Sequence, residues 1–142
     1  MMQPHSLTGI LVAAVAAWLF GAVYYTVLGK RWMAAQGLTP EQCKAERAAK
    51  STFAKVLPFV LSFVATFIMG VVLYGIMTHS GLFYARAGAI SGAFCWFGFV
   101  LTTITVNNAY AGRRASLTVI DAVHWLFVLV IIGAIVGGFG PG

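Results

Sequence analysis

The sequence predicts an all-α integral membrane protein: a four-transmembrane-helix bundle with a short cytoplasmic helix in its first loop. Of its 142 residues, 61% are hydrophobic and 8% are charged, whereas a soluble domain carries about 25% charged residues. The chain also contains four apolar runs of about 20 residues, the length that crosses a hydrocarbon core of about 30 Å as a helix. The short segments of alternating polarity that build a transmembrane β-barrel are missing. Lipid is therefore the expected solvent of this fold.

The apolar runs predict helices at about residues 7–28, 56–77, 87–106 and 117–138. Because the chain is short, we expect one membrane domain over residues 1–142. The first run is too long for the apolar part of a cleavable signal peptide, and no basic segment precedes it. We therefore expect it to remain as the first helix.

The first loop carries the pattern of a helix start. Thr39 is suited to the N-cap position, Pro40 to the first helical position and Gln42 to the third, where it completes a capping box. We expect a short helix on the cytoplasmic surface that ends at about Lys50. In the second apolar run, Pro58 is expected in the first turn, where a proline removes no hydrogen bond.

Small residues recur every four positions in three of the apolar runs. Such seams allow membrane helices to approach closely, which matters because lipid supplies no hydrophobic drive between them. The glycine pairs of the third and fourth helices are expected at the same membrane level. Near the end of the first helix, Tyr24, Tyr25 and Trp32 are expected in an interfacial aromatic belt. The predicted packing residues are Gly9, Ala13, Ala17, Gly21, Gly88, Gly92, Gly133 and Gly137.

The third helix is predicted to have a mixed face. At about 100° per residue, Gly92, Trp96, Thr103, Asn107 and Tyr110 fall on one side of the helix. This face begins with a small residue and ends with polar ones. The bundle is therefore expected to be tight at its periplasmic end and looser at its cytoplasmic end.

Basic residues are distributed unevenly between the two sides of the predicted bundle. Of nine Lys and Arg, eight lie in the two loops on one side, and only Arg86 lies on the other. Because cytoplasmic loops collect Lys and Arg, we expect a multi-pass protein of the bacterial inner (plasma) membrane with both termini periplasmic. The basic charge thus indicates topology and contact with anionic lipid, and no nucleic-acid binding is expected. The eight are Lys30, Arg31, Lys44, Arg47, Lys50, Lys55, Arg113 and Arg114.

Polar side chains are concentrated where the third and fourth helices meet. Asp121 is the only acidic residue inside an apolar run, and His124 follows on the same helix face. In one interpretation, Asp121 pairs with Arg113 or Arg114, or accepts a hydrogen bond from Asn107, and so fixes the hairpin. In the other, Asp121 and His124 are a proton-carrying or substrate-binding pair that faces a cytoplasmic cleft. These five residues form the candidate polar site.

The remaining reactive side chains do not form a catalytic or metal site. His5 and His79 belong to the outer side and His124 to the inner side, so a single chain offers no two haem ligands at one depth. Cys43 and Cys95 are at different depths and have no metal-binding spacing. No cofactor, metal or catalytic residue is expected.

Two stretches carry a family resemblance. The first is residues 21–33, GAVYYTVLGKRWM, followed by Gly37 and Leu38; the second contains residues 96–99, 107–108, 112–113 and 120–121. Together they resemble the signatures of a small bacterial membrane protein family catalogued as domain of unknown function 1761. The resemblance implies four transmembrane helices and no particular activity.

Three functions are compatible with these features. The first is a non-enzymatic homo-oligomer that binds or moves a small molecule or ion, because one four-helix bundle encloses little space. The alternative is an accessory subunit of a larger membrane complex. A membrane enzyme that uses Asp121, His124 and Arg113 is the third, but it has no recognisable catalytic constellation.

The charge distribution generates a prediction about orientation. In a Cys-free background, a membrane-impermeant thiol reagent added from outside should label a cysteine at Ser80 and should not label one at Ala48. The expected orientation follows from the eight basic residues on one side. The reverse labelling pattern would overturn it.

Overall fold

We describe residues 4–142 of a computed structural model of the chain, in which four helical segments are long and apolar enough to cross a membrane. These segments are His5–Val27, Thr52–Ser80, Ala85–Tyr110 and Ala115–Phe139. They confirm the four expected apolar helices. Each begins two to four residues before the predicted start, because the residues just before each apolar run, most of them small or polar, also join the helix.

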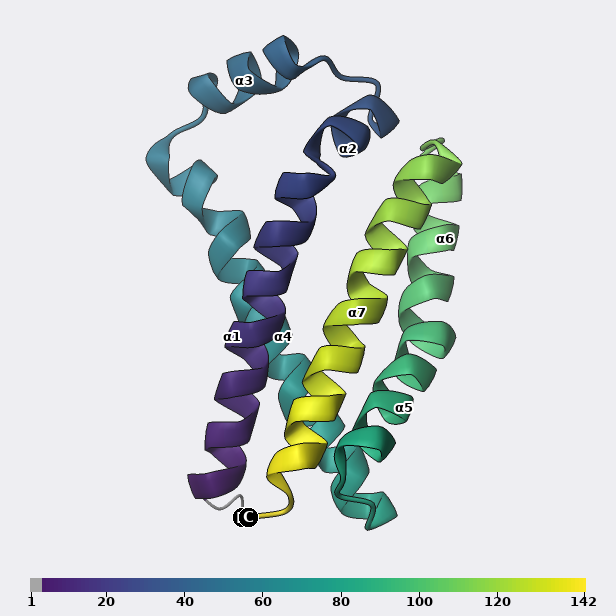
Figure 1. Cartoon of the computed structure of the whole chain (residues 1–142). Helices are drawn as coiled ribbons and strands as arrows, with labels where there is room; N and C mark the ends of the chain where they lie inside the picture. The colour runs from purple at the N-terminus through teal and green to yellow at the C-terminus, as the bar shows by residue number, and fades with distance from the viewer. Residues whose placement is uncertain (1–3) are drawn as a thin grey trace.

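The described residues contain helices and no strand (Figure 1). The elements are α1 (Pro4–Val27), α2 (Gly29–Ala35), α3 (Pro40–Ala49), α4 (Thr52–Ser80), α5 (Ala85–Cys95), the π-helix η1 (Trp96–Leu101), α6 (Thr102–Tyr110) and α7 (Ala115–Phe139). The start of α1, the end of α7 and the α4–α5 turn lie at one end of the bundle, here called the terminal end. Helices α2 and α3 and the α6–α7 connection lie at the opposite end, the loop end.

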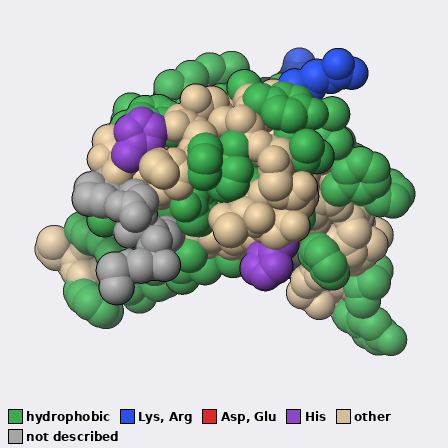
Figure 2. All heavy atoms as spheres, turned by 90° about the horizontal axis from the view of Figure 1, so that it is seen from below, with side chains coloured by type: hydrophobic (Ala, Val, Ile, Leu, Met, Phe, Trp, Pro, Cys, Tyr) green, Lys and Arg blue, Asp and Glu red, His purple; other side chains and the backbone are tan. Residues whose placement is uncertain are grey.

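The two ends differ in charge. Seen from the terminal end, the surface consists mainly of apolar and uncharged polar groups; basic side chains appear only at its edge, and no acidic side chain is visible (Figure 2). At the loop end, α2 and α3 alone contain Lys30, Arg31, Lys44 and Arg47. The helices therefore collect basic residues at one end, as the loop pattern predicts.

Helix α3 begins as expected. The Thr39 hydroxyl accepts a hydrogen bond from the Gln42 N–H at 3.2 Å, and the Gln42 side-chain oxygen accepts one from the Thr39 N–H at 2.8 Å. This is the predicted capping box. None of the residues of α3 is buried, so it is a surface helix.

The position expected for Pro58 is wrong. The Ser51 hydroxyl accepts a hydrogen bond from the Ala54 N–H at 3.2 Å and caps α4, so the helix begins before its apolar run and Pro58 lies inside it. A proline there cannot donate to the carbonyl four residues earlier. This half of α4 is weakly packed: Phe53 is 73% exposed and Phe59 is 52% exposed.

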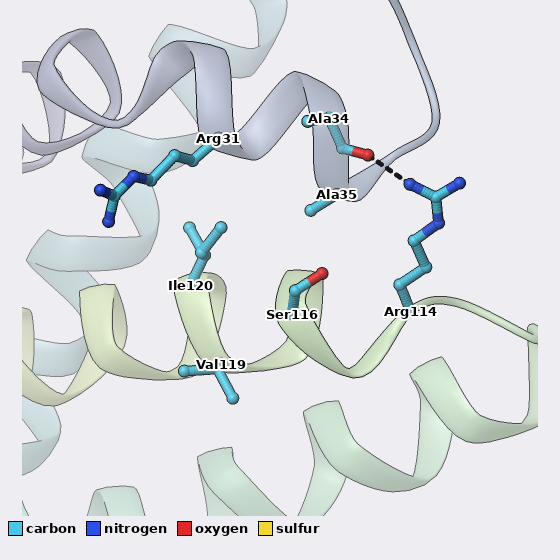
Figure 3. A pocket seen from close by; sticks show the side chains of 7 residues that line it. All are labelled: Arg31, Ala34, Ala35, Arg114, Ser116, Val119 and Ile120. Atoms are coloured by element: carbon cyan, nitrogen blue, oxygen red, sulfur yellow. Dashed lines mark hydrogen bonds between the residues drawn. The ribbon is translucent and has the colours of Figure 1, made fainter.

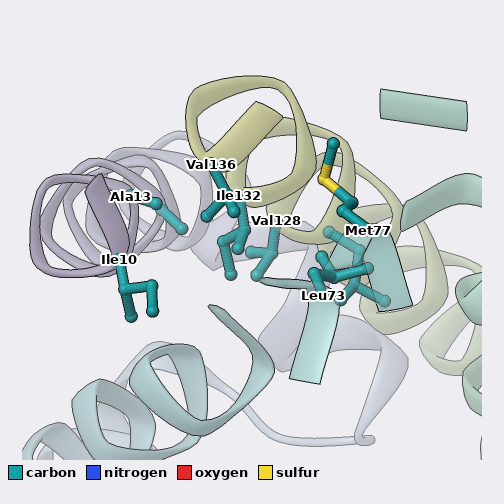
Figure 4. Close-up of a cluster of buried hydrophobic side chains, with 9 residues drawn as sticks. Ile10, Ala13, Leu73, Met77, Val128, Ile132 and Val136 are labelled. Atoms are coloured by element: carbon teal, nitrogen blue, oxygen red, sulfur yellow. The ribbon is translucent and has the colours of Figure 1, made fainter. Parts of the chain in front are cut away.

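The apolar core lies in the half of the bundle nearest the terminal end. Helices α1, α4 and α7 meet there, and most of the core side chains have no exposed surface. This arrangement agrees with a bundle that is tight at one end and looser at the other. The labelled core residues in Figure 4 are Ile10, Ala13, Leu73, Met77, Val128, Ile132 and Val136.

The small residues of α1 pack against its neighbours as predicted. Ala13 and Ala17 are completely buried, and a Cβ added to Gly9 would lie 2.9 Å from the Phe139 side chain of α7. On another side of α1, the Trp18 indole N–H donates to the Ser62 hydroxyl of α4 at 3.0 Å. Helix α1 is therefore held between α7 and α4.

The glycine pairs of α5 and α7 bring two backbones into direct contact. A Cβ added to Gly88 would collide with the Gly133 carbonyl group, and one added to Gly133 would collide with the Gly88 carbonyl group. Gly92 faces the Leu129 carbonyl in the same way. Gly137 lies against the Tyr84 carbonyl, which precedes α5. The predicted common level of the two pairs is confirmed.

This backbone contact predicts a strong dependence on side-chain size. Gly133→Ala should lower the free energy of unfolding by about 1–3 kcal/mol, because the new methyl group overpacks the helix pair. The control is Gly75→Ala in α4, where a Cβ has open space and where Ala favours the helix over Gly by up to about 1 kcal/mol. Equilibrium unfolding in detergent measures both. Equal losses of stability in the two variants would contradict the contact.

Candidate functional site

Asp121 lies in the first half of α7 and is bound by α1. The Tyr25 hydroxyl donates a hydrogen bond to Asp121 Oδ1 at 2.7 Å, and the Asp121 side chain is partly buried. The expected partners Arg113, Arg114 and Asn107 are not bonded to it in the described part of the chain. That expectation is wrong because Tyr25 reaches the carboxylate from the neighbouring helix, whereas the arginines precede the helix and remain exposed.

Two further donors bind α7 beside Asp121. The Tyr24 hydroxyl donates to the Ile120 carbonyl at 2.6 Å, and the Trp96 indole N–H donates to the Ala122 carbonyl at 2.7 Å. Three consecutive residues of α7 therefore accept hydrogen bonds from α1 and η1. An unsatisfied polar group has a high free-energy cost in lipid. Each of these hydrogen bonds therefore removes the cost of burying an unpaired donor.

His124 is the other titratable residue of this region, and it is surrounded by aromatic rings. Its side chain is 8% exposed. The Phe20 ring is stacked on the imidazole at 6.3 Å between centroids, and the Tyr25 and Trp125 centroids each lie 4.8 Å away. Nδ1 is buried and has no hydrogen-bond partner among residues 4–142. This nitrogen is a buried group that can take up or donate a proton.

Gly21 provides the space that His124 occupies. A Cβ added to Gly21 would lie 2.8 Å from His124 Nε2, closer than nonbonded carbon and nitrogen atoms approach. The last member of the predicted small-residue seam on α1 therefore accommodates a polar ring as well as allowing close helix packing. Asp121 and His124 thus both contact α1.

The predicted face of the third transmembrane segment is only half correct. Gly92 is buried and Trp96 is partly buried, but Thr103, Asn107 and Tyr110 are exposed, Tyr110 by 91%. The π-helix η1 explains the difference: its wider turn contains an additional residue, so every later position is rotated relative to an uninterrupted α-helix.

Asn108 therefore takes the place expected for Asn107. Its amide N–H donates to the Thr118 hydroxyl of α7 at 3.0 Å, one residue later than the α-helical spacing predicts. The sequence pattern contains two adjacent asparagines, and only the unpredicted π turn decides which of them faces α7.

The two arginines lie apart from Asp121. Arg113 is exposed, and an Arg114 guanidinium N–H donates to the Ala34 carbonyl of α2 at 2.6 Å. The predicted polar site therefore divides into two regions. One contains Asp121 and His124, and the other is a surface region around Arg114.

The sequence pattern predicts Tyr24 and Tyr25 in an interfacial belt and does not connect them with Asp121. Both have a hydroxyl that needs a hydrogen-bond partner when it is buried. This requirement is the sequence signal that could have linked them to the carboxylate. The helical spacing predicts correctly that Trp96 lies on the same side as Gly92, but it does not predict the hydrogen bond of Trp96 to α7. The site therefore depends on α1 more than the local pattern indicates.

The sequence matches a known protein family. A family model described as protein of unknown function DUF1761 matches residues 8–137. The chain belongs to this family. The resemblance inferred from the sequence signatures is thereby confirmed. No curated protein and no solved structure matches the chain. The family description assigns no activity, so a functional hypothesis has to be based on the geometry of the site.

The Tyr25–Asp121 hydrogen bond predicts a measurable coupling. Asp121→Asn retains an oxygen acceptor and should keep most of the thermal stability in detergent, whereas Asp121→Leu removes the acceptor and should lower it. A double-mutant cycle with Tyr25→Phe should give a coupling of about 0.6–1.7 kcal/mol, the range for hydrogen bonds between membrane helices. Tyr110→Phe, at an exposed position, is the control. Fully additive effects of Tyr25→Phe and Asp121→Leu would exclude the interaction.

Proposed function

We propose that this chain is a multi-pass protein of the bacterial inner membrane that takes up a proton at Asp121 and His124 and thereby binds or moves a small molecule or ion. One observation supports this most strongly. A carboxylate and a buried imidazole lie one helical turn apart in an apolar segment, and Asp121 forms no ion pair within residues 4–142. Ionisable residues inside membrane helices are rare and costly, and they often mark proton or ion pathways.

A proton fits this site better than a larger cation does. Phe20, Tyr24, Tyr25 and Trp125 would form an aromatic cage for an organic cation, but the His124 ring already occupies the space between them. A charge on the buried His124 is costly, and the Tyr24 and Tyr25 rings, whose centroids lie 5.5 Å and 4.8 Å from that of the imidazole, would offset about 0.5–2 kcal/mol of that cost. A proton on Asp121 would remove the cost of a charge in the membrane, about 2.5–3.5 kcal/mol at mid-helix.

Proton uptake would act on the contact between α1 and α7. Tyr25 and Gly21 on α1 touch Asp121 and His124 on α7, so both titratable groups face the same helix pair. The glycine contacts hold α5 against α7 toward the terminal end. The movable part of the bundle is then the loop end, where protonation would alter how closely α1 approaches α7.

We further propose that several copies act together, with both termini periplasmic. The orientation is supported by the basic residues of the loop end. Assembly is proposed because a single four-helix bundle encloses little space for a pathway. Phe94, Phe97 and Phe99 of α5 and η1, which are 73%, 64% and 73% exposed, offer a face on which lipid or further helices can pack. The same faces would suit an accessory subunit of a larger complex. Mass measurement after native purification separates the two, because it yields either homomers or a complex with other chains.

Infrared titration of the purified protein in nanodiscs tests the proton site. The chain has only three acidic side chains, Glu41, Glu46 and Asp121, so a protonated carboxyl band can be assigned. Acidification should produce a band that Asp121→Asn abolishes and Glu46→Gln retains. His124→Phe should shift the titration of that band, because interacting sites titrate as a pair, whereas His79→Phe should leave it unchanged. A band that survives Asp121→Asn would refute the proposal.

A further inference from the structure

A surface groove lies between α2 and the first turns of α7, and an arginine stands near each end of it (Figure 3). Its volume is about 570 Å³, and it is shallow and open along its length. The Arg31 side chain comes from α2, and the Arg114 side chain comes from the residue that precedes α7. The groove does not include Asp121 or His124, so it is separate from the proton site proposed above.

The interior of the groove is mainly apolar. Ala35 of α2 faces Ile120 of α7 across it, and the Ser116 hydroxyl is a polar group within it. Val119 also lines the groove. A site of this kind suits an amphiphile, whose charged group is held by the arginines and whose apolar part lies along the alanine, valine and isoleucine side chains.

The groove has an uncompensated positive charge. The Arg31 side chain has no hydrogen bond or ion pair with residues 4–142. Arg114 donates to the Ala34 carbonyl, but a guanidinium has five N–H donors, so further donors are available. The first turn of α7 contains no acidic residue and has no side-chain cap, so the helix dipole adds to the attraction for an anion. Planar guanidinium groups are well suited to bind phosphate oxygens.

The groove also lies at the level of the membrane surface. The first apolar span ends at Val27, shortly before Arg31, and the last span begins at Ala115, immediately after Arg114. The phosphate groups of a bilayer lie at this level, next to the ends of the hydrocarbon core. A soluble anion would gain nothing from the apolar interior, whereas the acyl chain of a lipid would cover it.

From these observations we propose that the groove between α2 and α7 binds an anionic membrane phospholipid, whose phosphate-containing headgroup is attracted by Arg31 and Arg114 at the two ends of the groove and whose acyl chains begin on the apolar interior. The bound lipid would join α2 to α7 at the loop end, where the bundle has few buried side chains.

The test uses native mass spectrometry of the full-length protein in a mild detergent. Phosphatidylglycerol and phosphatidylcholine with identical acyl chains are titrated separately, and retention of one lipid per chain is measured. The wild type should retain phosphatidylglycerol preferentially. Arg31→Gln and Arg114→Gln should each weaken its retention roughly fivefold, and the double variant roughly 25-fold, the effect of about one surface cation each.

The matched control is Lys44→Gln with Arg47→Gln, which removes two charges from α3, outside the groove. It should retain phosphatidylglycerol as the wild type does. The Arg31 side chain is exposed and forms no hydrogen bond or ion pair with residues 4–142, so Arg31→Gln removes no such interaction from the fold; unchanged thermal unfolding of this variant separates a loss of lipid from unfolding. Unchanged retention in the double variant, or equal losses in the double variant and the control, would overturn the proposal.

Two further measurements distinguish a lipid headgroup from free phosphate as the bound group. Thermal unfolding is followed with inorganic phosphate alone and with phosphatidylglycerol. Stabilisation by phosphatidylglycerol only supports a lipid site. Equal stabilisation by inorganic phosphate would assign the groove to a soluble anion, and equal retention of phosphatidylcholine would remove the role of charge; either result overturns the proposal. Asp121→Asn should leave lipid retention unchanged, which separates this test from that of the proton site.

Discussion

The contact between the backbones of α5 and α7 is the constraint on which the rest of the bundle depends. In lipid, apolar side chains gain little by leaving their solvent for one another, so association rests on close packing and hydrogen bonds. Gly88 and Gly133 allow that packing, because each lies against the carbonyl group of the other. This contact positions α7 as the helix on which α1 and α4 also pack.

The polar groups are arranged around this fixed helix. Because α5 occupies the glycine face of α7, α1 covers the face that carries Asp121 and His124. Both faces of α7 are therefore covered within one chain. A second copy is therefore not required to cover α7.

The features that the sequence predicts correctly are those set by neighbouring residues. The capping box of Thr39 and the glycine spacing of Gly88 and Gly133 are local patterns, and each leads directly to a contact. The bond between Tyr25 and Asp121 joins residues 96 positions apart, so no periodicity can reveal it. The choice of Asn108 was also not predictable, because it depends on a π turn that has no clear residue signature.

The threonines that follow the π-helix are bonded to their own helix. Thr102, Thr103 and Thr105 are exposed, and their hydroxyls donate to the carbonyls of Gly98, Phe99 and Leu101 one turn earlier. Each hydroxyl is therefore hydrogen-bonded within its own helical segment, and mostly methyl groups remain on the outside. Hydropathy scales count these threonines as weakly polar, yet the surface that they present is closer to that of valine. The polarity of a membrane helix is therefore a property of its folded backbone as well as of its composition.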